Sequence, residues 1–421
     1  MFEPAQLAAV LIAGAATAGV ILRPFGWREA IFAVAGALAL VLPGLISPAQ
    51  ALAAVLRGRD VYLFLAGMMI LAELARRERV FDWSAAMAAR LARGSARRLF
   101  DLVFLTGVVV TALLSNDATA VVLTPAVYAA ARATRADPMP GLYACAFVAN
   151  AASFLLPISN PANLVLFGAH IPALWPWIVW FGLPSLLALG ATWGVMRLVF
   201  RRALAAPIVA HVPRPALALP GKLAALGIGL ACAILLATSA LGGPLGLATF
   251  IAGVLAAALV LVAGKSSPLP LLQGVSWSVI PLVAGLFVLV AGLESAGVVA
   301  LLSDALTGLA EKAPRGTGFG AGLLLALASN LMNNLPAGLL AASAAPAGLV
   351  PPAITGALLV GVDLGPNMSI TGSLATILWL IAIRREGLNV TVFAFLKIGL
   401  LVTVPALMTA LIAVVLLAPT G

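Results

Sequence analysis

The sequence predicts an all-α polytopic membrane protein with two inverted repeats, each of about five transmembrane helices, one re-entrant hairpin and a broken helix. Of the 421 residues, 63% are hydrophobic and 9% are charged, so the chain has too few charges for a water-exposed surface. Apolar runs of the roughly 20 residues needed to cross a bilayer recur along its length. The order of runs and polar interruptions in the first half returns in the second.

Each half contains five apolar segments that could cross the membrane. A cleavable signal is not expected in the first segment, because Glu3 stands where a signal peptide carries basic residues. Residues 201–221 contain four prolines and no apolar run. They are expected to form a cytoplasmic linker between repeats at 1–200 and 222–421. The predicted crossings are residues 5–22, 28–46, 60–76, 141–170 and 174–200, then 222–241, 245–264, 277–294, 353–383 and 389–418.

Between the third and fourth crossings of each half lies a predicted re-entrant hairpin, at residues 99–133 and 317–345. Each reads apolar, polar, apolar, and the polar centres are residues 115–117 and 329–334. Such a tip is tolerated at membrane depth only where it faces protein or a water-filled cavity. An amphipathic stretch expected to lie along the membrane interface precedes each hairpin. These stretches are residues 81–99 and 298–312.

The repeat is visible in matched residues, because Gly67 pairs with Gly285 and Val80 with Val298, each at a spacing of 218. An odd number of crossings plus a hairpin in each half requires the second half to be inverted. With the N-terminus outside, 19 of the 24 Lys and Arg fall in cytoplasmic segments. Both termini are therefore predicted outside. Because the basic residues flank apolar spans, the net charge of +10 does not indicate a nucleic-acid partner.

The fourth crossing of each half, residues 141–170 and 353–383, is predicted to be a broken helix. Pro157 and Pro161 interrupt the first, and Pro366 lies within the second. Proline removes a backbone donor and clashes with the preceding turn, which frees backbone groups for a substrate or ion. Aligning residues 158–159 with 370–371 gives a spacing of 212. For the hairpin tips, matching residue 116 to 334 gives 218, which we prefer to the spacing of 214 from matching 115 to 329.

Two acids, Asp117 and Asp363, lie deep inside these interrupted segments. An ionised carboxylate there is costly unless it is paired, hydrated or protonated. We therefore predict that both carry protons, although an aspartate can also cap a helix. Together with Asn116 and Asn334 they are predicted to converge near the midplane. Uncharged amides and hydroxyls suit a neutral polyhydroxy solute, although some of them would satisfy only backbone groups. The predicted substrate-binding residues are Ser115, Asn116, Asp117, Asn160, Asn163, Asn333, Asn334, Asn367 and Ser373.

Other reactive side chains are few. Cys145 and Cys232 lie in apolar segments, and His170 and His211 lie outside the predicted core, so no metal site is expected. Lys397, within the last crossing, could balance Asp363 or extend to the membrane surface. The sequence contains no P-loop, GxSxG or HExxH pattern, so we expect neither an enzyme nor a cofactor.

Four runs carry a resemblance to a known family: LLSNDATAVVLTP, FVANAASFLLPISNPANLVLFG, SNLMNNLPAG and VGVDLGPNMSITGSLATILWL. They resemble segments of the ArsB-type arsenite and antimonite efflux permeases of the ion transporter superfamily. The resemblance covers nearly the whole chain. It implies export of As(III) and Sb(III) hydroxides in exchange for protons, by alternating access. It also implies optional docking of a soluble arsenite-stimulated ATPase at the cytoplasmic face.

The chain lacks three neighbouring cysteines, so this reading requires that hydrogen bonds recognise the cargo hydroxyls. Two alternatives use the same fold. A sodium/proton antiporter needs only carbonyls, hydroxyls and one or two carboxylates, all of which are present. Anion transport is less favoured, because no arginine lies in the four core segments, the polar centres of the two hairpins and of the two broken helices.

Overall fold

The computed structural model describes residues 3–210, 212–213 and 215–419, which form helices and the turns between them. Five helices are long and apolar enough to cross a membrane by length and composition, namely α1, α11, α13, α14 and α22. The predicted crossings of the first half are α1 (Pro4–Leu22), α2 (Glu29–Val41), α4 (Arg59–Arg77), α9 (Met139–Ala151) with α10 (Pro161–Phe167), and α11 (Leu174–Val199). Those of the second half are α13 (Leu219–Ala240), α14 (Leu245–Ala263), α16 (Val279–Ser295), α20 (Pro352–Leu364) with α21 (Leu374–Arg385), and α22 (Val392–Leu416).

The two predicted hairpins are helix pairs that meet at polar tips. The first comprises α6 (Ala96–Leu113), α7 (Asn116–Ala118), a π-helical turn (Thr119–Leu123) and α8 (Thr124–Thr134). The second comprises α18 (Pro314–Met332) and α19 (Asn334–Ala344). The amphipathic stretches before them are α5 (Val80–Leu91) and α17 (Val298–Lys312), and α17 is bent by 73° from α16.

Three short α-helices in the described part of the chain were not predicted, α3 (Pro48–Arg57), α12 (Arg201–Ala205) and α15 (Leu269–Gly274). Helix α3 begins with a signal that the sequence already contains. Ser47 accepts a hydrogen bond from the Gln50 N–H, and the Gln50 side chain accepts one from the Ser47 N–H. With Pro48 in the first turn, this capping box starts a helix that is too short for an apolar-run search to detect.

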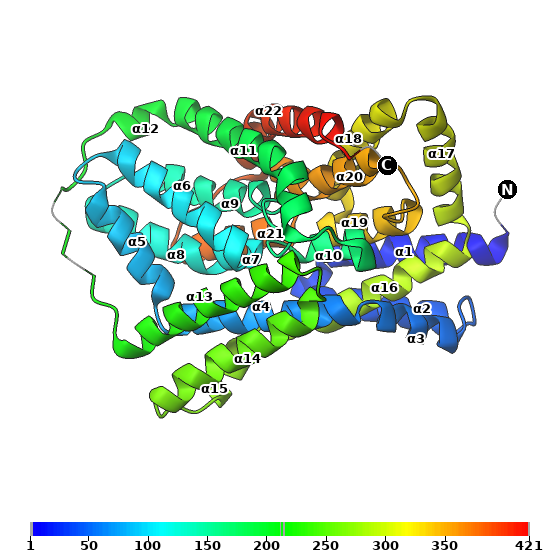
Figure 1. The fold of residues 1–421 in the computed structure, drawn as a ribbon, viewed down its shortest axis with the longest axis horizontal. Helices are drawn as coiled ribbons and strands as arrows, with labels where there is room; N and C mark the ends of the chain where they lie inside the picture. The colour runs from blue at the N-terminus through cyan, green and yellow to red at the C-terminus, as the bar shows by residue number, and fades with distance from the viewer. Residues whose placement is uncertain (1–2, 211, 214, 420–421) are drawn as a thin grey trace.

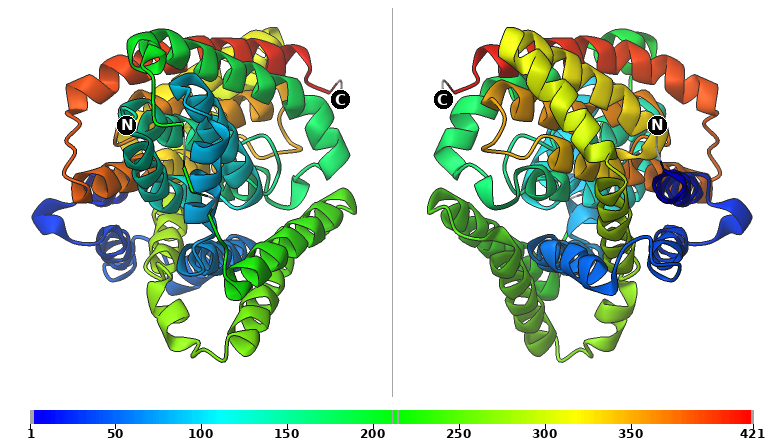
Figure 2. Two further views of the ribbon diagram at one scale, coloured as in Figure 1. Left: turned by 90° about the vertical axis from the view of Figure 1, so that its left-hand side faces the viewer. Right: turned by 90° about the vertical axis from the view of Figure 1, so that its right-hand side faces the viewer.

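The helices form two layers (Figure 1). One layer contains α1–α4 and α13–α16, and the other contains α5–α12 and α17–α22. Figure 2 shows the first layer spread beneath the second when the molecule is viewed along its long axis. Each layer therefore draws helices from both halves of the sequence. Figure 1 marks both chain ends toward the right, whereas the connection after α12 (Arg201–Ala205) lies on the left.

The order of elements repeats along the chain, and two matched glycines make the same kind of helix contact in the two halves. Gly67 of α4 faces the backbone of Thr249 in α14, and Gly285 of α16 faces the backbone of Ala33 in α2. In each case the third crossing of one half packs closely on the second crossing of the other, and only a residue without a side chain fits. The matched glycines are thus sites of close helix approach. The division into two inverted repeats remains a prediction.

We predict that Gly67→Leu lowers the apparent melting temperature of the purified protein. The added side chain must displace the α14 backbone, and overpacking of this kind costs about 1–3 kcal/mol or more. Gly229→Leu is the matched control, because Gly229 of α13 has no neighbouring atom within 4 Å of its added Cβ. Thermal denaturation in detergent measures both variants. Equal melting temperatures would contradict the close α4–α14 approach.

Candidate functional site

A cavity of about 490 Å³ lies where the two layers meet. One wall is α4 with residues 274–279, and the other is the first hairpin tip with the first turns of α10 and α21. Charged residues line the end of the cavity at which α4 and α21 terminate. Arg76 and Asp82 there are about half exposed, at 52% and 51%, so the cavity opens to solvent at that end. The charged lining residues at this end are Glu73, Arg76, Asp82 and Arg385.

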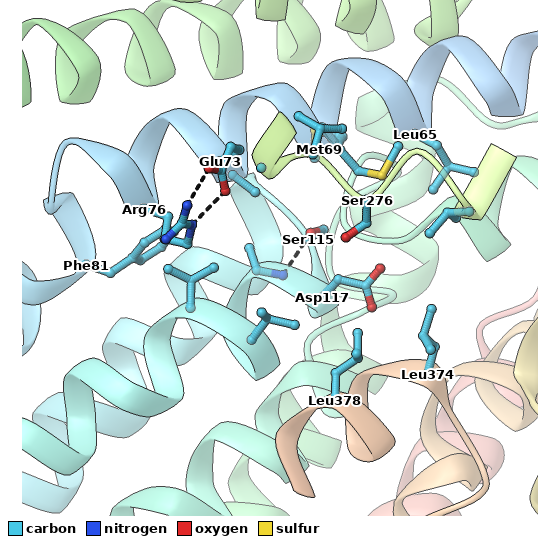
Figure 3. Close-up of a pocket in the computed structure, with 18 of the residues that line it drawn as sticks. Leu65, Met69, Glu73, Arg76, Phe81, Ser115, Asp117, Ser276, Leu374 and Leu378 are labelled. Atoms are coloured by element: carbon cyan, nitrogen blue, oxygen red, sulfur yellow. Dashed lines mark hydrogen bonds and ion pairs between the residues drawn. The ribbon is translucent and has the colours of Figure 1, made fainter. Parts of the chain in front are cut away.

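Asp117 is the acidic group beside the hairpin tip in this cavity. Figure 3 shows its carboxylate between Ser276 on one wall and Leu374 and Leu378 on the other. Among the described residues, this carboxylate has no hydrogen-bond or ion-pair partner. The Ser115 hydroxyl caps α7 instead, accepting from the Ala118 N–H at 3.1 Å. A capping role for Asp117 is therefore wrong, and its carboxylate is available to a ligand or a proton.

Asn116 lies beside Asp117 but does not line the cavity. It is 5% exposed, and its Oδ1 accepts from the Asp117 N–H at 2.9 Å. The amide therefore braces the tip backbone.

The second hairpin tip carries Asn333 and Asn334, which lie away from Asp117. Asn333 has φ +72°, and its Oδ1 accepts from the Leu335 N–H at 3.4 Å, so it caps α19. The Asn334 N–H donates to the Gly372 carbonyl at 2.9 Å and ties this tip to the break between α20 and α21. Asn333 lines a separate space of about 10 Å³.

That small space is built from residues equivalent to those of the large cavity. Each of five lining residues in the cavity has a partner 218 positions later that lines the small space. The pairs are Phe64 with Leu282, Met68 with Leu286, Ser115 with Asn333, Asp117 with Leu335, and Ala118 with Pro336. The spacing of 218 therefore describes the hairpin tips. The two sites differ in size, and the cavity acid is replaced by leucine.

The two broken helices cross at buried hydrogen bonds that join the halves. Asn160 Nδ2 donates to Asp363 Oδ1 at 2.8 Å, and Asn150 Nδ2 donates to Asn367 Oδ1 at 2.9 Å. We call these two bonds the crossing pair. Asp363 has no solvent exposure, and its Oδ2 has no partner among the residues that the structure describes. Asp363 therefore accepts one hydrogen bond within the described structure, and its second oxygen is buried without a donor.

The predicted convergence of Asn116, Asp117, Asn334 and Asp363 in one cavity is not met, because only Asp117 lines it. The alignment of the two broken helices also differs from the predicted one by a single residue. Asn160 and Ser373 cap α10 and α21 at a spacing of 213, one residue from the predicted 212. This register makes Asn150 the counterpart of Asp363.

Two predicted binding residues, Asn163 and Asn367, are committed to the protein backbone. Asn163 Nδ2 lies 3.0, 3.2 and 3.3 Å from the carbonyls of Ser153, Leu156 and Pro157, so it holds the segment between α9 and α10. Asn367 Nδ2 donates to the Phe147 carbonyl at 2.9 Å. Both amides satisfy backbone carbonyls that the helix breaks expose.

Sequence reasoning missed several cavity residues on α4, including Met68, Met69, Glu73 and Arg76. They belong to a regular helix, so no interruption of the apolar run marks them. Arg76 Nε donates to Glu73 Oε2 at 2.6 Å, and this spacing of three residues was the available signal.

Lys397 is exposed on α22, which excludes a pairing with the buried Asp363. His170 is exposed, and His211 lies outside the described residues.

Comparison with known proteins identifies relatives that cover most of the chain. A family model described as "CitMHS: Citrate transporter" matches residues 17–361. An "Arsenical pump membrane protein" of Yersinia enterocolitica is 31% identical, over 80% of this chain and 81% of the relative. One of Escherichia coli is 32% identical over the same shares. The Alcanivorax borkumensis YdaH transporter has the same fold, with TM-score 0.61, 18% identity, and coverage of 99% of this chain and 100% of that one.

We predict that Asn163→Ala destabilises the protein, because three buried carbonyls lose a shared donor, a change of about 1–3 kcal/mol. Asn389→Ala is the matched control, since Asn389 is exposed between α21 and α22. Denaturation in detergent and the yield of monodisperse protein measure the effect. A fully stable Asn163→Ala that fails only in transport would instead make Asn163 a ligand.

Proposed function

Since the chain belongs to the citrate transporter family, we propose that it is a secondary carrier that exports arsenite and antimonite in exchange for protons. Family membership makes it a multi-pass ion transporter of the inner membrane. The cargo would be the uncharged hydroxides of As(III) and Sb(III), carried by alternating access. The observation that carries this proposal is the identity of 31–32% to arsenical pump membrane proteins over four fifths of the chain.

The cavity chemistry supports a neutral cargo. Beside the hairpin tip, the polar lining consists of Asp117, the Ser115 hydroxyl and Ser276, without a cation. Hydroxyl groups on the cargo can donate to the Asp117 carboxylate, and such charge-assisted hydrogen bonds are the stronger kind. Ser276 adds a group that can donate or accept.

We propose that Asp117 and Asp363 share the proton coupling. Asp117 faces the solvent-connected cavity, so a proton can reach it from the open side. Asp363 belongs to the crossing pair, where its charge would have to be compensated in both conformations. Protonation of Asp363 makes its Oδ2 a hydrogen-bond donor and removes the buried charge. Proton occupancy can therefore shift the equilibrium between two arrangements of the broken helices.

Alternating access is supported by the paired spaces at the two hairpin tips. The open cavity at the first tip and the closed space at the second lie between the same two layers. A shift of one layer against the other would enlarge one space and close its counterpart. In the proposed orientation, with both termini outside, the open cavity faces the cytoplasm. A soluble arsenite-stimulated ATPase could dock at that same face.

An anionic cargo such as citrate has some support from the family description and from Arg385 in the cavity. Arg76 is already paired with Glu73, and Asp117 would repel a carboxylate at the tip. Sodium/proton antiport uses the same acids and remains the second candidate.

Everted membrane vesicles that contain the protein should accumulate arsenite when their interior is acidic. Protons then leave through the carrier, and arsenite enters in exchange. Arsenite counted inside filtered vesicles measures this, and vesicles without the protein are the control. Sodium movement driven by the pH gradient, with no arsenite accumulation, would replace the proposal with sodium/proton antiport.

In the same vesicles, Asp117→Asn and Asp363→Asn should each reduce arsenite accumulation to background. Asparagine at 363 retains the acceptor for Asn160 but cannot exchange a proton, so the variant should still fold. Asp304→Asn, on the exposed face of α17, should transport normally. Full proton-driven transport by a folded Asp363→Asn would remove Asp363 from the coupling and leave Asp117 as the carrier.

A further inference from the structure

Seven exposed arginines gather around the connection between the two halves. Three lie at the turn between α5 and α6, two at the end of α8, and two in α12. We call this group the linker arginine cluster. Its members are Arg93, Arg97, Arg98, Arg132, Arg135, Arg201 and Arg202.

The linker holds these three elements together. The Ile208 N–H donates to the Gly94 carbonyl at 3.3 Å, and the Val209 N–H donates to the Thr134 carbonyl at 2.8 Å. Ser95 also pairs with Pro207 as an isolated β-bridge. Since Gly94 follows Arg93 and Thr134 precedes Arg135, these bonds fix the two turns side by side.

The positive charge of the cluster is not neutralised within the described part of the chain. None of the seven arginines forms an ion pair there. The neighbouring acids are engaged elsewhere. Asp101 lies 3.9 Å from Arg197 and accepts from Trp193 Nε1 at 2.9 Å, and Asp137 Oδ1 accepts from the Met139 N–H. Arg132 also lies over the Tyr128 ring, with its guanidinium carbon 5.9 Å from the ring centroid. Concentrated guanidinium groups without an ion-pair partner in the described chain indicate an anionic ligand.

The surroundings favour a lipid as that ligand. Helix α6 exposes Leu105 and Val109 at 58% and 48%, as a helix that faces acyl chains does. Arg97 and Arg98 lie in its first turn, where such a helix meets the headgroups.

We propose that the linker arginine cluster binds an anionic phospholipid, with its phosphate on the guanidinium groups and its acyl chain along the exposed apolar face of α6 at Leu105 and Val109. Basic pockets between helices on the cytoplasmic side are suited to such headgroups. The site would bridge the base of the first hairpin, formed by α6 and α8, to the linker. A bound lipid would therefore brace the hairpin whose tip carries Asp117. The proposal is independent of the cargo.

The test measures phosphatidylglycerol retained by the protein in phosphatidylcholine nanodiscs, by native mass spectrometry. The triple variant Arg97→Gln, Arg98→Gln, Arg135→Gln should lose about fivefold in lipid affinity per arginine at low salt. The control triple Arg59→Gln, Lys312→Gln, Arg315→Gln removes three exposed charges at the opposite end and should retain the lipid. Lysine at positions 97, 98 and 135 should restore most of the binding.

Three results would overturn the proposal. Equal losses in the cluster and control variants would show only general charge attraction. Displacement of the lipid by millimolar inorganic phosphate would assign the cluster to a soluble phosphate. An unchanged phosphatidylglycerol count in the cluster variant, with the protein monodisperse, would leave the cluster to an acidic protein partner.

Discussion

The structure depends on how it satisfies backbone groups where helices begin inside the protein. Helices α7, α10, α19 and α21 all start in buried positions, and each start has donors with no partner in its own helix. Each helix is capped by the side chain of its preceding residue, Ser115, Asn160, Asn333 or Ser373. With no water in the hydrocarbon core, these caps are what permits interrupted helices at membrane depth. The caps use most of the polar side chains at the breaks. Among the described residues, the Asp117 carboxylate, Asp363 Oδ2, Asn150 Oδ1 and Asn163 Oδ1 have no hydrogen-bond partner.

The crossing pair joins the halves at the same place. Asn160 caps α10 with its oxygen and donates to Asp363 with its nitrogen, so one side chain connects the start of a helix in one half to the acid in the other. At the spacing of 213, Asn150 matches Asp363 in the predicted repeat, so one half has an amide where the other has an acid. A change of proton occupancy at Asp363 therefore acts directly on the contact between halves, whereas Asp117 meets the solvent of the cavity. In the proposed mechanism, this separation gives one acid to the cargo pathway and one to the conformational change.

The described helices coincide with the apolar runs of the sequence and the breaks between them with its polar interruptions, because both are local properties. The ten crossings and the two re-entrant hairpins stay predictions. Sequence reasoning missed α3, α12 and α15, which are too short to register as runs, although the Ser47–Gln50 capping box marked α3. It also placed Asn163 and Asn367 at a ligand, because an amide that binds a substrate and one that binds a carbonyl look alike in sequence. The α4 wall of the cavity, with Met68 and Glu73, arises only when the two layers pack. For the same reason, the sequence showed two equivalent tips but not that one is open and the other closed.

In the proposed mechanism, the open cavity closes and its closed counterpart opens during transport. The accessibility of engineered cysteines measures this exchange. In a Cys145→Ala, Cys232→Ala background, Val121→Cys places a thiol in the cavity and Leu335→Cys places one in the closed space. A membrane-impermeant maleimide should label position 121 from the cytoplasmic side while position 335 stays protected. Arsenite with an acidic exterior should slow the first reaction and expose position 335 to the outside. Equal labelling of both positions, unchanged by arsenite and pH, would show that the two spaces do not exchange open and closed states.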